Sequence, residues 1–148
     1  MVVLLKINKM REYLAKVRIP EEIKNESTGF IGEKIFELWF TYNFQDEPLF
    51  KQKADMDFKK IDFADSKGYT YQVKTTAAKT FTFNCDLEAI DEHLTSNKYV
   101  FIQLKDSYAY IEPIYEKEDI KTKLKRSFKV EHQCFVYCKD LLQRELFI

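Results

Sequence analysis

The hydrophobic and polar residues of the chain follow two periods, and each stretch of constant period predicts one helix or strand. Residues 29–42 have apolar side chains at helical spacing, with Ser27 or Thr28 as the N-cap. A similar pattern predicts an N-terminal helix over residues 3–18, ending before Pro20. The apolar stripe of the 29–42 helix consists of Ile31, Ile35, Leu38, Trp39 and Tyr42, widened by Phe36 and Phe40.

Strands are predicted where residues alternate or where apolar residues run continuously. Residues 57–76 form two alternating segments around a polar turn that ends in Gly68. Residues 98–104 read as a strand buried on both faces, and Pro113 places the following hairpin at a sheet edge. The other predicted elements are strands at 49–53 and 133–138, an extended piece at 81–83, and helices from Asn84 or Asp86 through Ser96, at 116–130 and at 139–146.

The turn between the two alternating segments determines which residues face each other. A three-residue hairpin loop closed by a left-handed glycine is common and suits this sequence. In that register Asp65 pairs with Tyr69, and Asp62 lies opposite Gln72. Because side chains alternate along a strand, Gln72 and Lys74 share a face. A carboxylate, an amide and an ammonium group are therefore expected within a few ångströms of one another.

This cluster suits metal-assisted phosphodiester chemistry. Mg²⁺ prefers oxygen ligands and is often held by few carboxylates together with substrate phosphate. A bound metal polarises the phosphate and lowers the pKa of a coordinated water. Lys74 would position that water or stabilise charge developing on the phosphate. The alternative is an exposed hairpin whose face is simply polar.

Two carboxylates of the 29–42 helix differ in their expected surroundings. Glu33 lies beside Phe40 at the border of the apolar stripe, where a carboxylate is destabilising unless it is paired or binds a metal. Glu37 lies further toward the polar side, with Lys34 and Thr41, and is expected to be solvated. Glu33 is therefore the helix residue that strengthens the case for a site.

The order of these pieces resembles the PD-(D/E)XK nuclease superfamily, the restriction-endonuclease-like proteins, in its Gln-x-Lys variant. The resemblance extends over about residues 29–105 and is similar to that of some intron-encoded homing endonucleases and transposon-end nucleases. It implies an α/β (α+β) fold with an αβββαβ core, in which helices flank a mixed sheet, here with an N-terminal helix and a C-terminal strand and helix added. The residues that carry it are Gly29, Gly32, Glu33, Asp62, Gln72, Val73, Lys74, Thr75 and Thr76.

The resemblance also implies a site and an activity. Asp62, Gln72 and Glu33 would hold Mg²⁺, for which Mn²⁺ can substitute, and Lys74 would act near the attacking water. The implied protein is a Mg²⁺-dependent endodeoxyribonuclease of restriction or homing type. Its partner would be DNA, most simply a duplex, and cutting both strands would require a homodimer or higher homo-oligomer.

Several alternatives stay open. Gln72 supplies a neutral amide where most members of the superfamily have a carboxylate, which should weaken metal binding. Asp57, and more distantly Asp55, are rival metal ligands, since a β-bulge would turn Asp57 to the Gln72 face. The chain is otherwise a non-catalytic DNA-binding or assembly module with the same fold, or a nuclease for branched DNA of the junction-resolvase kind.

Composition bounds these readings. The 148 residues suit one domain, and 24 basic against 24 acidic residues give zero formal net charge. A general basic coat is thereby excluded, so DNA binding would require charge separated onto faces. The predicted 116–130 helix carries six Lys or Arg residues and is either a solvated helix or a phosphate-contacting element.

Three cysteines, an odd number without dense spacing, indicate a reducing compartment. Cys134 and Cys138 lie near His132, but no second Cys/His pair at zinc-binding spacing accompanies them, so we expect the thiols to pack in the core. No run approaches the roughly 18 apolar residues of a membrane span, and the start of the chain is too short in apolar residues for a signal peptide. A cytoplasmic protein without membrane contact is expected.

Overall fold

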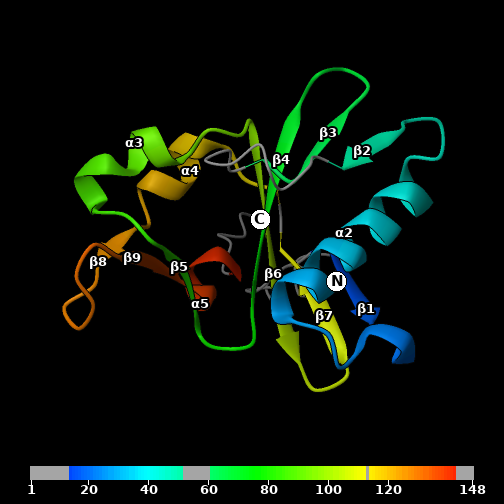
Figure 1. The fold of residues 1–148 in the computed structure, drawn as a ribbon, viewed down its shortest axis with the longest axis horizontal. Coiled ribbons are helices and arrows are strands. Elements are labelled where there is room, and N and C mark those ends of the chain that lie inside the picture. Colours follow the sequence, from blue (N-terminus) through cyan, green and yellow to red (C-terminus); the bar gives the residue numbers. More distant parts are fainter. Residues whose placement is uncertain (1–13, 52–60, 113, 143–148) are drawn as a thin grey trace, which may run out of the picture.

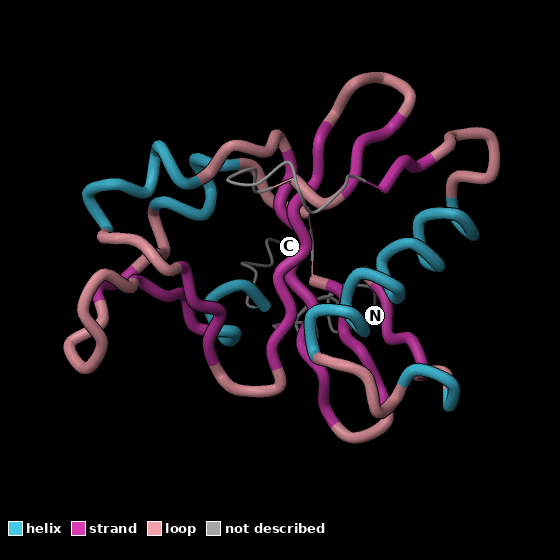
Figure 2. The backbone as a smooth tube through the Cα atoms, in the orientation of Figure 1, coloured by secondary structure: helices cyan, strands magenta, loops and turns pink. Residues whose placement is uncertain are grey.

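A computed structural model describes residues 14–51, 61–112 and 114–142. They form a mixed α/β structure in which one long helix packs on one side of a large sheet and a small sheet with short helices packs on the other (Figure 1). Figure 2 shows that strands and loops predominate outside the long helix. Within these ranges no helix has the length and apolar character needed to cross a membrane.

The larger sheet has six strands in the order β1-β7-β6-β4-β3-β2. Its neighbours pair antiparallel except β4 and β6, which are parallel. The strands are β1 (Ala15–Arg18), β2 (Leu49–Lys51), β3 (Phe63–Asp65), β4 (Thr70–Thr76), β6 (Lys98–Lys105) and β7 (Tyr108–Ile111).

The smaller sheet has three antiparallel strands in the order β5-β9-β8. The remaining elements are the three strands of this sheet and several short helices and helical turns. These elements are β5 (Thr80–Phe83), β8 (Lys125–Arg126), β9 (Cys134–Tyr137), η1 (Glu21–Ile23), η3 (Leu87–Ala89), α3 (Ile90–His93), α4 (Lys117–Lys121) and α5 (Cys138–Leu142).

Helix α2 (Thr28–Asn43) confirms the predicted 29–42 helix, and the Ser27 hydroxyl accepts a hydrogen bond from the Phe30 N–H at 3.3 Å as its N-cap. The predicted stripe is wrong at one border, because Leu38 and Tyr42 are 51% and 77% exposed. The side of the helix that contains Gly32 faces the sheet instead. Its buried residues are Ile31, Gly32, Ile35, Phe36 and Phe40.

The large sheet separates two apolar cores, and strand β6 contributes to both. Val100 and Ile102 pack in the core under α2, whereas Tyr99 and Phe101 pack in the core under the smaller sheet. This alternation on a fully covered strand explains the continuous apolar run at 98–104 and confirms the strand predicted there. The predicted C-terminal strand and helix are also present, as β9 and α5.

The predicted N-terminal helix is wrong over its described part, because residues 15–18 form strand β1. There Ala15 and Val17 face the α2 core while Lys16 and Arg18 are exposed, so the period is two. Strand β1 pairs with β7, which therefore lies inside the sheet and not at its edge as predicted. Residues 1–13 and Pro113 lie outside the described residues.

Two predicted helices are shorter than expected. Helical residues within 84–96 are limited to η3 and α3, and within 116–130 to α4. A capping box of Glu116 and Asp119 starts α4, but Lys125 and Arg126 pair with β9 instead of continuing it. Strand pairing here outweighs the high helix propensity of lysine and arginine.

Gly32 marks the closest approach of α2 to the sheet. A Cβ atom there would lie 2.7 Å from the Thr75 Cβ, a separation that packed side chains do not reach. We therefore expect Gly32→Ala to lower the free energy of unfolding by about 1–3 kcal/mol, measured by urea denaturation. Gly29→Ala is the control, since nothing lies within 4 Å of its added Cβ. Thr75→Ala removes the Oγ1 and Cγ2 atoms that also crowd the added Cβ, so the Gly32→Ala effect should shrink in that background, and equal effects in both backgrounds would contradict the packing explanation.

Candidate functional site

The paired strands β3 and β4 have the predicted register, but the predicted pairing of Asp62 with Gln72 is wrong, because the Asp62 N–H donates to the Tyr71 carbonyl. Phe63 pairs with Tyr71, which continues to Asp65 opposite Tyr69, and the Asp65 N–H donates to the Tyr69 carbonyl at 2.9 Å. Gly68 has φ +91°, as the glycine-closed loop requires. The turn is held by the Asp65 carboxylate, which accepts hydrogen bonds from the N–H groups of Lys67 and Tyr69 at 2.9 and 3.0 Å.

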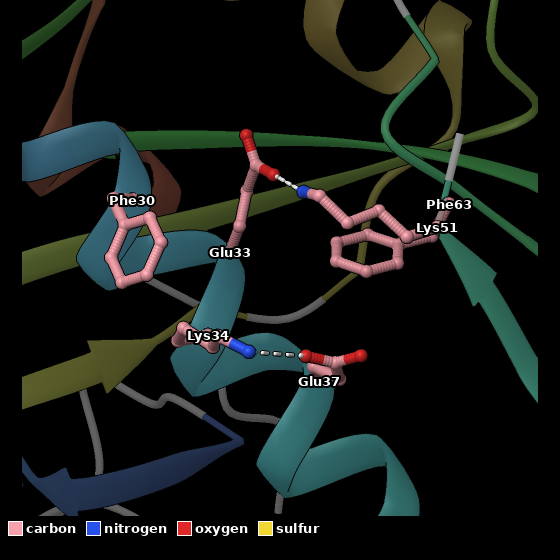
Figure 3. Close-up of a pocket in the computed structure, with 6 residues that line it drawn as sticks. All are labelled: Phe30, Glu33, Lys34, Glu37, Lys51 and Phe63. Carbon is pink, nitrogen blue, oxygen red and sulfur yellow. Dashed lines mark hydrogen bonds and ion pairs between the residues drawn. The ribbon is translucent and has the colours of Figure 1, made fainter. Parts of the chain in front are cut away.

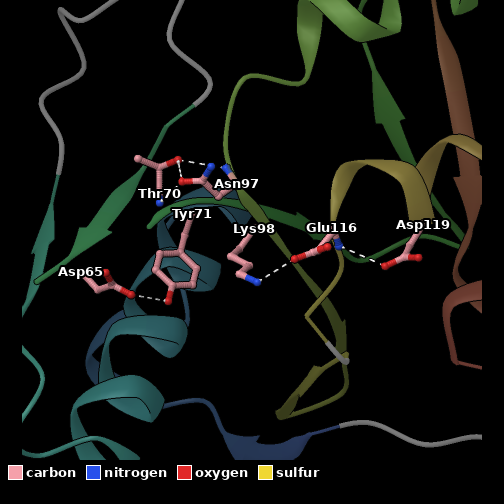
Figure 4. A network of polar contacts seen from close by, with 7 residues as sticks. All are labelled: Asp65, Thr70, Tyr71, Asn97, Lys98, Glu116 and Asp119. Atoms are coloured by element: carbon pink, nitrogen blue, oxygen red, sulfur yellow. Dashed lines mark hydrogen bonds and ion pairs between the residues drawn. The ribbon is translucent and has the colours of Figure 1, made fainter. Parts of the chain in front are cut away.

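Polar contacts also fix the start of β4 (Figure 4). The Tyr71 hydroxyl donates to Asp65 at 2.8 Å. Burial, and then this hydrogen bond, raise the pKa of the hydroxyl above its ordinary value. The Thr70 N–H donates to the Asn97 side-chain oxygen at 2.9 Å, and the Asn97 N–H donates to the Thr70 hydroxyl at 3.0 Å. These bonds join Thr70, the first residue of β4, to Asn97, directly before the parallel strand β6, so β4 is anchored on both sides.

Asp62 precedes β3 and departs from the regular ladder. Its N–H donates to the Tyr71 carbonyl at 2.8 Å, although Tyr71 is already the partner of Phe63. One residue of β4 thus faces two of the other strand, as in a β-bulge. The Asp62 carboxylate accepts the Val73 N–H at 2.8 Å, where a regular ladder would supply a main-chain carbonyl. The backbone of β4 therefore orients this carboxylate.

The electrostatic environment of Asp62 identifies its neighbours. Burial raises the pKa of its carboxyl above the ordinary value of 3.8, and the hydrogen bond from Val73 opposes that rise. The negative charge of Glu33 raises the pKa further, whereas Lys51 and Lys74 lower it. Two carboxylates and two ammonium groups thus share one neighbourhood, with Asp62 the most buried carboxylate among them.

Glu33 reaches this neighbourhood from α2 and forms an ion pair with Lys51 of β2 (Figure 3). The pair lies at a small pocket of about 150 Å³. Glu37 lies one turn further along α2 and pairs with Lys34 at 3.5 Å. The pocket is lined by Phe30, Glu33, Lys34, Glu37, Lys51 and Phe63.

Gln72 and Lys74 project from the opposite face of β4. Alternation turns them toward the smaller sheet, since Tyr71 and Val73 pack in the core under α2. The Lys74 ammonium donates to the Thr82 carbonyl at 2.8 Å and lies 4.5 Å from the centre of the Phe83 ring. Gln72 is 7% exposed, and its side-chain oxygen has no hydrogen-bond partner among the described residues.

The structure therefore places Glu33, Asp62 and Lys74 in one electrostatic neighbourhood, and Gln72 directly precedes the residue that binds Asp62. Glu33 and Gln72, however, lie on opposite sides of β4, because Glu33 comes from α2 and Gln72 projects toward the smaller sheet. No three His, Cys, Asp or Glu residues gather into a metal-binding group within the described ranges. The rival ligands Asp55 and Asp57 lie outside those ranges.

Lys51 was not singled out by sequence reasoning beyond its place on the polar side of a strand. Its position follows from the pairing of β2 with β3, where Lys51 faces Phe63, the residue after Asp62. The sequence indicated three short strands in succession, which is the order that brings Lys51 beside Phe63. Nothing local, however, specifies that β2 pairs with β3.

The cysteines pack as predicted. Cys134 and Cys138 are buried in the core under the smaller sheet, and burial raises the pKa of the Cys134 thiol to about 12. His132 lies 3.0 Å from the Asp86 carboxylate. His93 meets the Phe83 ring edge-on at 6.1 Å between ring centres.

Comparison with known proteins adds no family. No family model matches the chain, and a search of curated proteins finds no match. What is shown is a mixed α/β structure in which the β3–β4 hairpin and helix α2 bring charged groups close to the half-buried Asp62.

The raised pKa of Asp62 predicts a pH-dependent stability difference. Because the folded state holds this proton more tightly than the unfolded chain, stability contributed by Asp62 falls as pH rises from about 3.8 through the raised pKa. Asp62→Asn keeps an acceptor for Val73 and lacks this fall, so it should be more stable than the wild type at neutral pH. The difference should vanish on acidification below pH 3.8, as measured by urea denaturation across pH.

Glu22→Gln, which removes one exposed carboxylate from η1, controls for the change in net charge. A stability difference for Asp62→Asn that stayed constant from acidic to neutral pH would show that the carboxyl is not destabilised by its surroundings.

Proposed function

We propose that the protein is a Mg²⁺-dependent endonuclease that hydrolyses phosphodiester bonds in DNA. The observation that carries the proposal is the half-buried Asp62 carboxylate, which the backbone of β4 orients within electrostatic reach of Glu33 and Lys74. Perturbed carboxyl groups next to opposite charges concentrate at functional sites. The proposed location is cytoplasmic, and the proposed active form is a homodimer or higher homo-oligomer, since cutting a duplex needs two sites.

The order of elements supports the same proposal. Helix α2 is followed by the antiparallel strands β2, β3 and β4, then by the short helix α3 and by β6, which is parallel to β4. Apart from β5, which lies between β4 and α3, this order agrees with the αβββαβ core that the resemblance to the PD-(D/E)XK superfamily implies. Strand β5, which is absent from that order, leaves the larger sheet and pairs with β9.

The donor groups fit a hard divalent cation. The side-chain oxygen of Gln72 is buried without a hydrogen-bond partner among the described residues, and Asp62, directly before the adjoining strand β3, supplies a carboxylate. Oxygen ligands of this kind suit Mg²⁺ or Mn²⁺, and Glu33, which lies on the α2 side of β4, would join Asp62 at an ion placed on that side. When bound, the ion would polarise the phosphate and lower the pKa of a coordinated water.

The chain's own residues would bind and orient the substrate. Because the Val73 N–H holds the Asp62 carboxylate, Asp62 would bind the cation in one orientation. Lys74, whose ammonium group lies 4.5 Å from the centre of the Phe83 ring, would stabilise negative charge on the phosphate. Lys51, now paired with Glu33, would become available to phosphate once Glu33 binds the cation.

A non-catalytic DNA-binding module is the second candidate. The ion pair of Glu33 with Lys51 favours it, because a neutralised Glu33 attracts a cation less strongly. The neutral amide of Gln72 and the zero net charge of the chain point the same way. Intact DNA binding without calorimetric binding of Mg²⁺ or Mn²⁺ would select this candidate over the enzyme.

Removing either central group should abolish cleavage without unfolding the protein. Asp62→Asn and Lys74→Ala should each lower the rate of Mg²⁺-dependent plasmid cleavage by at least about a hundredfold, since Asp62 would hold the cation and Lys74 would stabilise charge on the reacting phosphate. Lys79→Ala, in the exposed loop after β4, is the matched control and should cleave normally. Thermal melts establish folding, and full activity in both site variants would end the assignment.

Gln72→Glu should tighten metal binding. The change restores a carboxylate at nearly the same volume and adds one negative charge beside Asp62. Isothermal titration with Mn²⁺ should give a lower dissociation constant than for the wild type, and Gln103→Glu, further along the same face on β6, supplies a control for added charge. Equal tightening by both variants would argue against Gln72 as a ligand.

A further inference from the structure

Two lines of register partners cross the larger sheet toward its β1 edge. Partners in a sheet project side chains from the same face, so each line is a row of neighbouring side chains. The first line consists of Thr76, Gln103, Tyr110 and Lys16, and the second of Lys105, Tyr108 and Arg18.

These rows continue the face of the sheet from which Gln72 and Lys74 project. Lys74 lies two residues before Thr76 on β4, so both project toward the side of the smaller sheet. The alternate residues of β7, Ala109 and Ile111, pack in the core under α2 on the other side. Lys16, Tyr110 and Lys74 thus project from the same face of the sheet.

Cations and aromatic rings interleave at the β1 end of this face. The Lys16 ammonium lies 4.3 Å from the centre of the Tyr108 ring and 5.7 Å from that of Tyr110. The Arg18 guanidinium lies 5.5 Å from the Tyr108 ring and donates to its hydroxyl at 3.1 Å. Both cations are exposed and both tyrosines are half-buried, so ring and charge are presented together.

The charge of this surface differs from that of the whole chain. Residues 15–18 and 103–111 contain three cations, Lys16, Arg18 and Lys105, and one acidic residue, Asp106. Glu112, the next acidic residue on the chain, is fully buried. A positive surplus on a chain of zero net charge is the separation of charge that binding a polyanion requires.

Aromatic rings beside cations suit a nucleic-acid strand whose bases are unpaired. A duplex offers phosphates to Lys16 and Arg18 but keeps its base faces stacked, whereas a single strand offers both phosphates and base faces. An exposed cation–π contact corresponds to a factor of roughly 2 to 5 in an equilibrium constant. Stacking of a base on an aromatic side chain corresponds to roughly 5 to 150. A base can therefore displace the cation from the ring, and the cation then meets a phosphate.

We propose that the surface of Lys16, Arg18, Tyr108 and Tyr110 binds an unpaired strand of DNA and leads it along the sheet toward Lys74. The direction toward the site rests on the proposed nuclease function, but binding of the strand does not. The substrate class would then be DNA with a single-stranded segment, such as an overhang or a flap.

Fluorescence anisotropy of the full chain in EDTA tests the binding step without cleavage. Labelled oligothymidylate should bind more tightly than a duplex of equal length at the same salt concentration. Tyr108→Leu should weaken oligothymidylate binding by at least about fivefold, while Tyr108→Phe, which keeps the ring, should bind nearly as the wild type does. Lys16→Ala should reduce the slope of log affinity against log salt by about 0.7, the value for one phosphate contact on a single strand.

Matched substitutions outside this face are the controls. Tyr42→Leu removes an exposed ring from α2, and Lys129→Ala removes an exposed ammonium from the segment between β8 and β9. Neither should change oligothymidylate binding. The proposal is overturned if the wild type prefers the duplex, if Tyr108→Leu binds like Tyr42→Leu in folded protein, or if Lys16→Ala leaves the salt slope unchanged.

The two proposals fail separately. Strand binding in EDTA that responds to Tyr108 and Lys16, together with no Mg²⁺-dependent cleavage, would remove the nuclease and keep the strand-binding surface. Cleavage that responds to Asp62 and Lys74 but not to Tyr108 or Lys16 would keep the nuclease and remove the surface.

Discussion

The close contact between Gly32 and Thr75 is the constraint on which the arrangement of α2 and the larger sheet depends. With no side chain on Gly32, the helix lies near enough to β4 for the next residue, Glu33, to act on Asp62. The same contact sets the rotation of α2, which buries Phe36 and leaves Tyr42 in solvent. A single missing methyl group thus determines both the packing and the placement of charge.

Strand β4 performs two tasks because its faces belong to different layers. Its odd residues pack against α2, and its even residues meet the smaller sheet. Asp62 is bound to the edge of the strand through the Val73 N–H, and so lies between the two layers. Charged groups from both sides can therefore act on one carboxylate, although Glu33 and Gln72 project from opposite faces.

Local chemistry made the hairpin predictable. Gly68 and the polar turn before it were sufficient to give its register, and the Ser27 cap and helical spacing gave α2. What depends on distant partners was missed. Strand β1 forms because β7 offers it an edge, and Lys51 joins the site because β2 pairs with β3. Neither pairing leaves a mark in the residues nearby, so a helix was predicted where β1 lies.

The ion pair of Lys51 with Glu33 has a consequence for the binding of free cations by Glu33. A tethered ammonium group is present at a high local concentration at all times, so free cations must compete with it for the carboxylate. In the proposed nuclease, a polyanionic substrate would draw Lys51 away and relieve that competition. The carboxylate would then bind a cation more tightly in the presence of DNA than in its absence.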